Sequence, residues 1–328
     1  MKISVLGCGR WGSFIAWYLN SIGNEVYSWG PEDGYSYQIL KKTGRNEYVA
    51  LDKKITLTCN LREAVEHADV IVISIGAQGL REFIPKILPY TREEQNFILC
   101  MKGIEVDTGK RLSEVMIESG VAYDHIAVWV GPGHIQSFVR GEPNCMVIDS
   151  ANDKLKRKLA DSFKSNLIRF YYGNDLIGTE IGAAAKNVMG IAAGALDAIC
   201  PSLKGPLITR GAREVATLIK AMGGNELSAY GLALPIRITV NTGKIWQKDS
   251  GSKNWRKGLQ RPRRCVCSAK NITWKCRSPT RYITRVSVGA TTRNAAATRS
   301  ENCLRVKLKR NGIKFKIGKG FPKFREAL

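Results

Sequence analysis

The chain has 328 residues, with 51 Lys and Arg against 28 Asp and Glu, and 44% of its residues are hydrophobic. This length is enough for two domains with a sizeable core. No run of about 18 uncharged apolar residues is present, so the sequence predicts no membrane span, and the apolar start breaks at Gly7, too early for a signal peptide. The nine cysteines suggest free thiols in a reducing compartment, because those of the first 200 residues are scattered singly.

The positive charge is concentrated at one end of the chain. Residues 231–328 hold 25 of the Lys and Arg but only three acidic residues, Asp249, Glu301 and Glu326. Residues 1–230 hold 26 cations and 25 carboxylates, so they are almost neutral. The chain therefore consists of a near-neutral, enzyme-like body and a very basic segment that begins near residue 233.

The body alternates between strand-like and helix-like segments. Strands are expected at residues 2–6, 25–29, 55–58, 70–75, 96–101, 126–130, 145–148 and 167–172. Helices are expected at residues 10–22, 61–67, 78–88, 109–119, 153–164, 177–199 and 206–222. This order predicts an α/β fold, in which a Rossmann-like parallel sheet covered by helices on both faces precedes an incomplete all-α domain. We expect a dinucleotide-binding domain over residues 1–173, the start of a helical substrate domain over 174–233, and an irregular basic segment over 234–328.

A glycine-rich turn follows the first strand. In the pattern G-x-G-x-x-G, Gly7 permits the tight turn, Gly9 lets the backbone approach a pyrophosphate, and Gly12 lets helix and strand pack closely. The N-terminus of the following helix offers N–H groups to phosphates. A strand before the motif and a helix after it are the context that the motif requires. The sequence therefore predicts that NAD or NADP binds here.

The end of the second strand does not decide between the two cofactors. An acidic residue at this point accepts a hydrogen bond from the ribose 2′-OH of NAD, whereas an arginine favours the 2′-phosphate of NADP. Glu32 and Asp33 lie slightly late for this role, and no arginine occupies the turn. Both residues are equally explained as solvated loop side chains, so the choice between NAD and NADP stays open.

Lys186 lies alone on an apolar helix. At helical spacing its neighbours are small or apolar, among them Gly182, Ala183, Met189 and Gly190. A surface lysine that extends its charge into water is the usual explanation for an isolated lysine. The small neighbours favour a different one, because they let a ligand approach closely. Partial burial would lower the pKa of Lys186 and let it exchange a proton near neutral pH.

Four stretches carry a resemblance to a known family. They are residues 7–12 (Gly-Cys-Gly-Arg-Trp-Gly), 100–105 (Cys-Met-Lys-Gly-Ile-Glu), 130–134 (Val-Gly-Pro-Gly-His) and 182–189 (Gly-Ala-Ala-Ala-Lys-Asn-Val-Met). Together they resemble the NAD(P)-dependent glycerol-3-phosphate dehydrogenases, over residues 1–233. The resemblance implies a 6-phosphogluconate dehydrogenase-like helical domain. It also implies interconversion of dihydroxyacetone phosphate and sn-glycerol 3-phosphate for glycerophospholipid synthesis, in a cytoplasmic protein that could form a homodimer.

The resemblance also implies roles for individual residues. The proton acceptor would be Lys186, with Lys102 as a second catalytic residue that reaches toward cofactor and substrate. The remaining cofactor contacts would come from Gly7, Gly9, Arg10, Trp11, Gly12, Gly131 and Ile135. The substrate would contact Lys102, Gly131, Gly133 and Lys186. The nicotinamide carries the hydride chemistry in such enzymes, while the protein supplies position and charge.

The sequence departs from the family at two places. Gly133 stands where the family usually has a serine or threonine, and His134 after it is explained equally well as part of the active-site wall and as a loop residue. After Ala233 the family continues with a Gly-Asp segment and a Ser/Thr-x-Asn-Arg segment that bind the substrate, but no aspartate appears here before Asp249. We favour a shifted reading frame near codon 233 as the explanation, and we expect this chain to have little activity.

The alternative function is a non-catalytic nucleotide-binding protein whose basic segment binds nucleic acid. Interleaved cations and aromatic side chains could contact phosphates and stack on bases, here with Trp246, Trp255 and Trp274. No recognised nucleic-acid-binding module is present, however, so the favoured partner is a small-molecule substrate and not nucleic acid.

A zinc site in the basic segment is a second alternative. Four cysteines could serve as ligands, namely Cys265, Cys267, Cys276 and Cys303. Their spacing contains no C-x-x-C pair, and the segment has no histidine. We therefore expect no metal site.

Overall fold

The computed structural model describes residues 1–199, 201–232, 271–272, 307–309, 312–314 and 317–318. The hypotheses on nucleic acid and zinc concern residues that lie almost entirely outside these ranges. Within 271–318 the structure has two short antiparallel pairs, β10 (Lys307–Lys309) with β11 (Gly312–Lys314), and β12 (Ile317–Gly318) with β9 (Asn271–Ile272). No helix in the described part is both long and apolar enough to cross a membrane.

The main sheet has eight strands in the order β3-β2-β1-β4-β5-β6-β7-β8. In chain order they are β1 (Lys2–Leu6), β2 (Glu25–Trp29), β3 (Thr56–Thr58), β4 (Val70–Ile73), β5 (Asn96–Leu99), β6 (Ile126–Val130), β7 (Asn144–Ser150) and β8 (Ile168–Tyr172). Neighbouring strands run parallel, except that β7 is antiparallel to β6. The Rossmann-like α/β class with a mainly parallel sheet is confirmed, and the structure adds that β7 and β8 run opposite to the other six strands. Hydrophobic periodicity locates a strand without giving its direction.

Helices connect most of these strands. They are α1 (Arg10–Ser21), α2 (Tyr35–Thr43), α3 (Leu61–His67), α4 (Leu80–Ile87), α5 (Leu112–Glu118), α6 (Ile135–Val139), α7 (Asp153–Phe163), α8 (Leu176–Ile199) and α9 (Lys204–Ala221). The sequence missed α2 and α6. Only Tyr37 and Leu40 of α2 are buried, so this helix lacks an apolar stripe, and α6 has only five residues.

Alternating strand residues build one apolar core on each face of the sheet. In β4, Val70 and Val72 belong to the core on one face, whereas Ile71 and Ile73 belong to the core on the other. This alternation is expected, because successive side chains of a strand point to opposite faces. Trp129 of β6 is fully buried in the first of these cores. The two covered faces make the sheet a rigid base for the loops at its edges.

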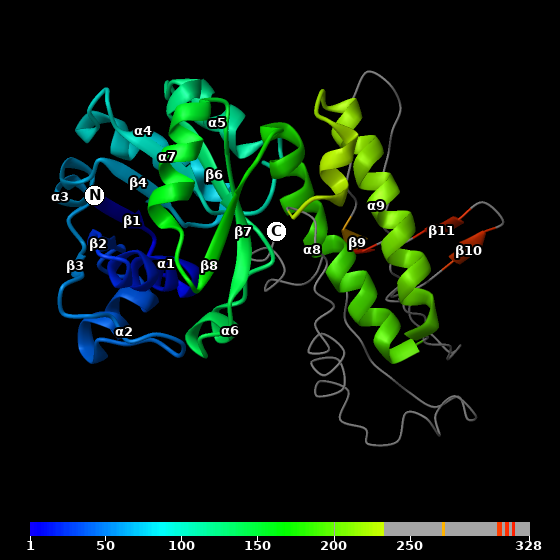
Figure 1. The fold of residues 1–328 in the computed structure, drawn as a ribbon, viewed down its shortest axis with the longest axis horizontal. Coiled ribbons are helices and arrows are strands. Elements are labelled where there is room, and N and C mark those ends of the chain that lie inside the picture. Colours follow the sequence, from blue (N-terminus) through cyan, green and yellow to red (C-terminus); the bar gives the residue numbers. More distant parts are fainter. Residues whose placement is uncertain (200, 233–270, 273–306, 310–311, 315–316, 319–328) are drawn as a thin grey trace, which may run out of the picture.

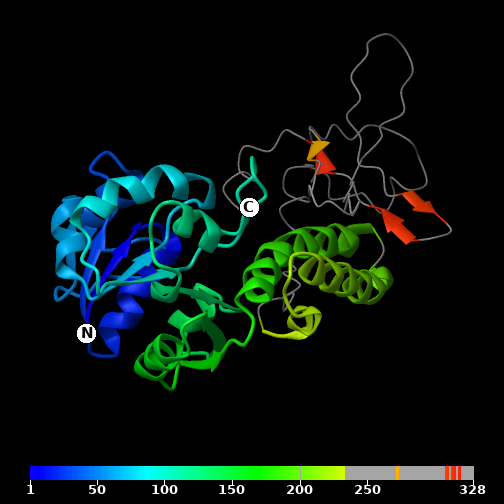
Figure 2. The same cartoon turned by 90° about the horizontal axis from the view of Figure 1, so that it is seen from above.

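The helices α8 and α9 pack against each other beside the sheet unit (Figures 1 and 2). Their contact is very close at Gly211, where a Cβ atom would lie 1.6 Å from Cε of Met189. The start of α8 is fixed to the sheet, because Thr179 donates a hydrogen bond of 2.7 Å to the buried carboxylate of Asp149 in β7. This anchor holds the first turns of α8 beside the strands of the sheet.

Candidate active site

The glycine-rich turn has the geometry that its motif predicts. Gly7 has a φ of 113°, and a Cβ atom on it would lie 2.3 Å from the carbonyl oxygen of Ser74. A Cβ atom on Gly12 would lie 1.7 Å from the carbonyl oxygen of Gly7, so the helix can approach the strand only without a side chain there. At Gly9 the same construction meets no described atom within 4 Å. The turn is therefore tightly packed on its protein side and open at Gly9, as a pyrophosphate site requires.

The cysteine of this turn has a packing role. The side chain of Cys8 is buried, and a Cβ atom on Gly30 would lie 2.3 Å from its Sγ. Burial raises the pKa of the Cys8 thiol to about 11, so it is unreactive at neutral pH. The following residues, Pro31 to Asp33, are exposed and contain no cation. The end of β2 therefore offers a 2′-phosphate no positive partner of its own.

Three segments that are far apart in the sequence meet near the carboxyl ends of the strands. Nζ of Lys102, in the loop after β5, lies 5.6 Å from the ring centroid of Trp11 at the start of α1. Burial and the nearby charge of Arg10 both lower the pKa of Lys102. The guanidinium of Arg10 in turn lies 5.7 Å from the ring centroid of Tyr48. The sequence did not single out Tyr48, because its loop has no motif.

Lys186 occupies the centre of this arrangement. Its side chain is half-buried, and its Nζ donates a hydrogen bond of 2.6 Å to the carbonyl oxygen of Gly131, directly after β6. Gly131 has a φ of 151°, and a Cβ atom on it would lie 2.9 Å from Cα of Met146. Only glycine can therefore turn this carbonyl toward Lys186 without strain.

The two lysines form a hydrogen-bonded pair. Burial lowers the pKa of Lys186 to about 6, with further contributions from the charge of Lys102 and from the hydrogen bond between them. The same hydrogen bond acts in the opposite direction on Lys102. Lys186 is therefore largely neutral near pH 7, where its lone pair can accept a hydrogen bond from Lys102. This agrees with the lowered pKa that the sequence predicts for Lys186.

The departure at Gly133 has a packing explanation. A Cβ atom at this position would lie 2.4 Å from Cε2 of Phe138, whose ring stacks on Phe14 at a centroid distance of 5.1 Å. A serine or threonine would have to displace this ring. The side chain of Ile135 is buried in the same core, so only its backbone could contact a cofactor. His134 is half-buried at the start of α6, and its role stays a prediction.

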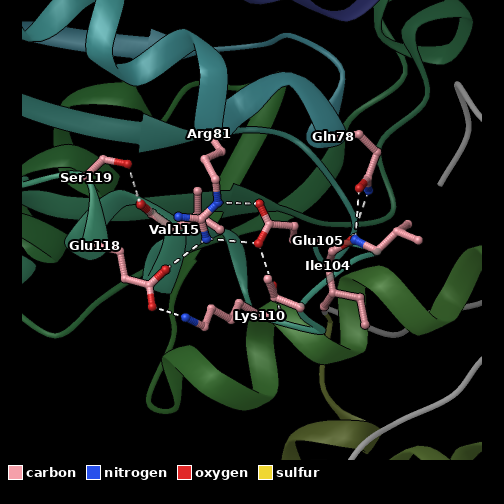
Figure 3. A network of polar contacts seen from close by, with 10 residues as sticks. Gln78, Arg81, Ile104, Glu105, Lys110, Val115, Glu118 and Ser119 are labelled. Atoms are coloured by element: carbon pink, nitrogen blue, oxygen red, sulfur yellow. Dashed lines mark hydrogen bonds and ion pairs between the residues drawn. The ribbon is translucent and has the colours of Figure 1, made fainter.

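A polar network fixes the loop that carries Lys102 (Figure 3). Arg81 of α4 makes two hydrogen bonds to the carboxylate of Glu105, of 2.7 and 2.9 Å, and one of 2.8 Å to Glu118. The side-chain amide of Gln78 donates to the carbonyl of residue 104 over 3.0 Å and accepts from the N–H of residue 106 over 2.9 Å. The loop is therefore held at its backbone by the short 3-10 turn before α4 and at the Glu105 side chain by α4 itself.

The dinucleotide turn, the lysine pair and the strand order define a nicotinamide-dependent dehydrogenase. The family model for the NAD-dependent glycerol-3-phosphate dehydrogenase N-terminus matches residues 2–156, and the one for the C-terminus matches residues 175–235. The chain belongs to this family. The C-terminal match ends two residues beyond Ala233, where the sequence already loses its resemblance. Within the described part of the chain, no cluster of His, Cys, Asp and Glu could hold a metal ion.

Individual relatives agree with this assignment. The chain is 34% identical to the glycerol-3-phosphate dehydrogenase (NAD(P)+) of Bacillus subtilis over 265 residues, which cover 78% of this chain and 75% of that protein. It is also 34% identical to the enzyme of the same name from a Thermoanaerobacter species, over 71% of each chain. The crystal structure of glycerol-3-phosphate dehydrogenase from Coxiella burnetii superposes with a TM-score of 0.68 and 25% identity, over 74% of this chain and 77% of that one.

Proposed function

We propose that residues 1–173 bind NAD or NADP, and that residues 174–233 complete a site where dihydroxyacetone phosphate and sn-glycerol 3-phosphate are interconverted. The observation that carries this proposal is the meeting of Arg10, Lys102 and Lys186 at the carboxyl ends of the strands. Ligands of α/β proteins bind at this edge of the sheet. The cytoplasm as location and a homodimer as assembly remain parts of the proposal that rest on the resemblance alone.

The turn between β1 and α1 fits a dinucleotide. Open space at Gly9 would admit the pyrophosphate, and no side chain caps the N-terminus of α1 or places an acidic group in its first turn. The indole N–H of Trp11 is buried without a hydrogen-bond partner among the described residues, so it could donate to a bound group. When bound, the nicotinamide would supply or accept the hydride. The chain itself would orient the cofactor and move the proton.

Lys186 is the proposed proton-transfer residue. In the oxidising direction its neutral amine would take the proton of the C2 hydroxyl group of glycerol 3-phosphate, and in the reducing direction its ammonium would return a proton to C2–O⁻. A pKa of about 6 lies near neutral pH, where a group of this kind exchanges protons most efficiently as a general acid and base. Lys102 would stabilise negative charge on the same oxygen as it develops.

The substrate phosphate has an incomplete site in this chain. The charged groups that shift the pKa of Lys102 and Lys186 are the lysines themselves and Arg10, and no described carboxylate is among them. Such a cationic environment favours an anionic substrate. The Gly-Asp and Asn-Arg segments expected after residue 233 are absent from the sequence, however. We therefore propose full cofactor binding but weak substrate binding.

The direct test combines a binding measurement with an assay. Titration with NADH and NADPH, followed by quenching of tryptophan fluorescence, should show saturable binding. Oxidation of NADH should then depend on dihydroxyacetone phosphate. Binding without any substrate-dependent oxidation, even at saturating substrate, would favour the non-catalytic alternative. Absence of dinucleotide binding would overturn both functions.

A further inference from the structure

A second polar cluster lies on α8, six residues before Lys186. The carboxylate of Glu180 is buried and accepts three hydrogen bonds at most 2.9 Å long, all from the N-terminus of α5, and the one from Arg111 is also an ion pair. Its Oε2 accepts a hydrogen bond of 2.7 Å from Nη1 of Arg111 and one of 2.6 Å from Oγ of Ser113. Its Oε1 accepts a hydrogen bond of 2.9 Å from the backbone N–H of Ser113. The contact between Arg111 and Glu180 joins residues that are 69 positions apart in the sequence.

Arg111 connects this cluster to the loop of Lys102. The backbone of Arg111 forms an antiparallel bridge with Ile104, two residues after Lys102. Beside this bridge, the backbone N–H of Glu105 donates a hydrogen bond of 2.9 Å to the carbonyl oxygen of Lys110, across the same loop. The loop is therefore a closed unit with two attachments, one to α4 through Arg81 (Figure 3) and one to α8 through Arg111.

Thr179, the residue before Glu180, anchors a second face of α8. Thr179 bonds to Asp149 of β7, while Glu180 bonds to Arg111 and Ser113. Successive residues of a helix point about 100° apart, so these two anchors determine both the rotation of α8 about its axis and its height. The rotation and the height of α8 together set the position of the Lys186 amine, because a rigid helix that shifts at its start also shifts six residues further on.

We infer that Glu180 is a positioning residue, whose buried contacts with Arg111 and Ser113 hold the loop of Lys102 and the helix of Lys186 in the relation that the lysine pair needs. This inference rests on the proposed function for the role of the pair. It deepens that function, because it assigns the alignment of the two amines to a residue that touches neither of them.

The position of Lys186 can be followed without any enzymatic activity. Trace labelling with a succinimidyl ester, followed by mass spectrometry, gives the fraction of neutral amine at each pH, and hence the midpoint of Lys186 in the whole chain. The variants are Glu180→Gln, which removes the charge but keeps the shape, and Glu180→Asp, which keeps the charge but shortens the side chain. Ser113→Ala is a milder third variant in case the others do not fold. Tyr18→Phe is the control, because it removes a buried hydroxyl group that bonds to Phe163 and Ser165, away from both lysines.

Positioning and charge predict opposite results. If Glu180 aligns the pair, each variant lets the amines separate and water enter, so the midpoint of Lys186 rises by about one pH unit or more toward its ordinary value. If Glu180 acted only through its charge, Glu180→Gln would lower the midpoint and Glu180→Asp would not change it. An unchanged midpoint in every folded variant would mean a merely structural role. Either of these two results overturns the inference.

The proposed function is tested separately in the same experiment. It requires that Lys186 of the unaltered chain label with a midpoint well below the ordinary lysine value of 10.5. An ordinary midpoint for the unaltered chain would contradict the proton-transfer role. A low midpoint that the variants leave unmoved would contradict only the positioning by Glu180.

Discussion

Nζ of Lys186 lies 2.6 Å from the carbonyl oxygen of Gly131, and this hydrogen bond joins α8 to the residue that directly follows β6. A neutral amine has two N–H donors and one lone pair. Lys186 can therefore donate a hydrogen bond to Gly131 and at the same time accept one from Lys102. A protonated Lys186 has no lone pair with which to accept a hydrogen bond from Lys102. The contact with Gly131 thus fixes the place of the amine that we propose as the proton acceptor.

The first prediction concerns the dinucleotide turn. Gly9→Val should abolish binding of NADH and NADPH, because its side chain would occupy the open space at Gly9 where the pyrophosphate is proposed to lie. The backbone of Gly9 is extended, with a φ of −67°, so valine should fold there without strain. Fluorescence titration measures the affinity. Gly205→Val in α9, where a Cβ atom also meets open space, is the control. Unchanged affinity in Gly9→Val would remove the motif from the proposed site.

The second prediction concerns stability as a function of pH. The pKa of Lys186 is about 6 in the folded chain against an ordinary value of 10.5, so between these limits the unfolded chain binds one proton more. The free energy of unfolding should therefore gain about 1.4 kcal/mol per pH unit from this group as the pH rises. Lys186→Met should remove that slope. Urea unfolding at pH 7, 8 and 9 compares the two proteins. Parallel plots of the free energy of unfolding against pH would show that the pKa of Lys186 is not lowered in the folded chain.

The sequence predicted those parts of the fold that depend on local patterns. The expected helix at residues 61–67 coincides with α3, whose start is fixed by the side chain of Asn60 accepting from the N–H of Glu63. The direction of β7 could not be predicted, because alternating hydrophobicity is the same in both directions. The helix α2 was missed because its surface is mostly polar.

The candidate site was predictable where a motif marks it. Lys102, Gly131 and Lys186 each lie in a stretch that resembles the family, and the structure brings them together. Glu180 and Arg111 lie in no chemical pattern of their own, and their pairing across 69 residues depends on how α8 packs against α5. Contacts of this kind follow from tertiary packing, which no local spacing encodes.

The third prediction concerns the choice of cofactor. The exposed turn after β2 has Pro31 and Glu32 but no cation, so NADPH should bind no better than NADH. Pro31→Arg should raise the ratio of NADPH to NADH affinity about tenfold, because an arginine can make charge-assisted hydrogen bonds to the 2′-phosphate. Tyr123→Arg adds the same charge at an exposed position elsewhere and is the control. Equal ratios in the two variants would place the ribose away from this turn.

The fourth prediction concerns the activity of the chain as it stands. Without the Gly-Asp and Asn-Arg segments, the substrate phosphate lacks charge-assisted hydrogen bonds worth roughly 1.5–3 kcal/mol each, and its misplacement also costs orientation. Turnover with dihydroxyacetone phosphate at about 0.15 M salt should be far below the ordinary value of about 10 per second. A chimera that joins residues 1–233 to the corresponding end of the Bacillus subtilis relative should restore it. Ordinary turnover by the unaltered chain would mean that residues 234–328 build a phosphate site, and would contradict a shifted reading frame.

The last prediction concerns Lys186 in that chimera. Lys186→Met should lower turnover by about 10²–10⁴, because it removes the group that exchanges a proton with the C2 oxygen, while the affinity for NADH stays within about twofold. In the oxidising direction the unaltered chimera should gain activity as the pH rises through about 6, since only the neutral amine can accept the proton. Steady-state kinetics across pH measure both effects. Lys86→Met, on the exposed side of α4, should change neither. A loss below tenfold in Lys186→Met would return Lys186 to the class of surface lysines whose charge merely reaches into water.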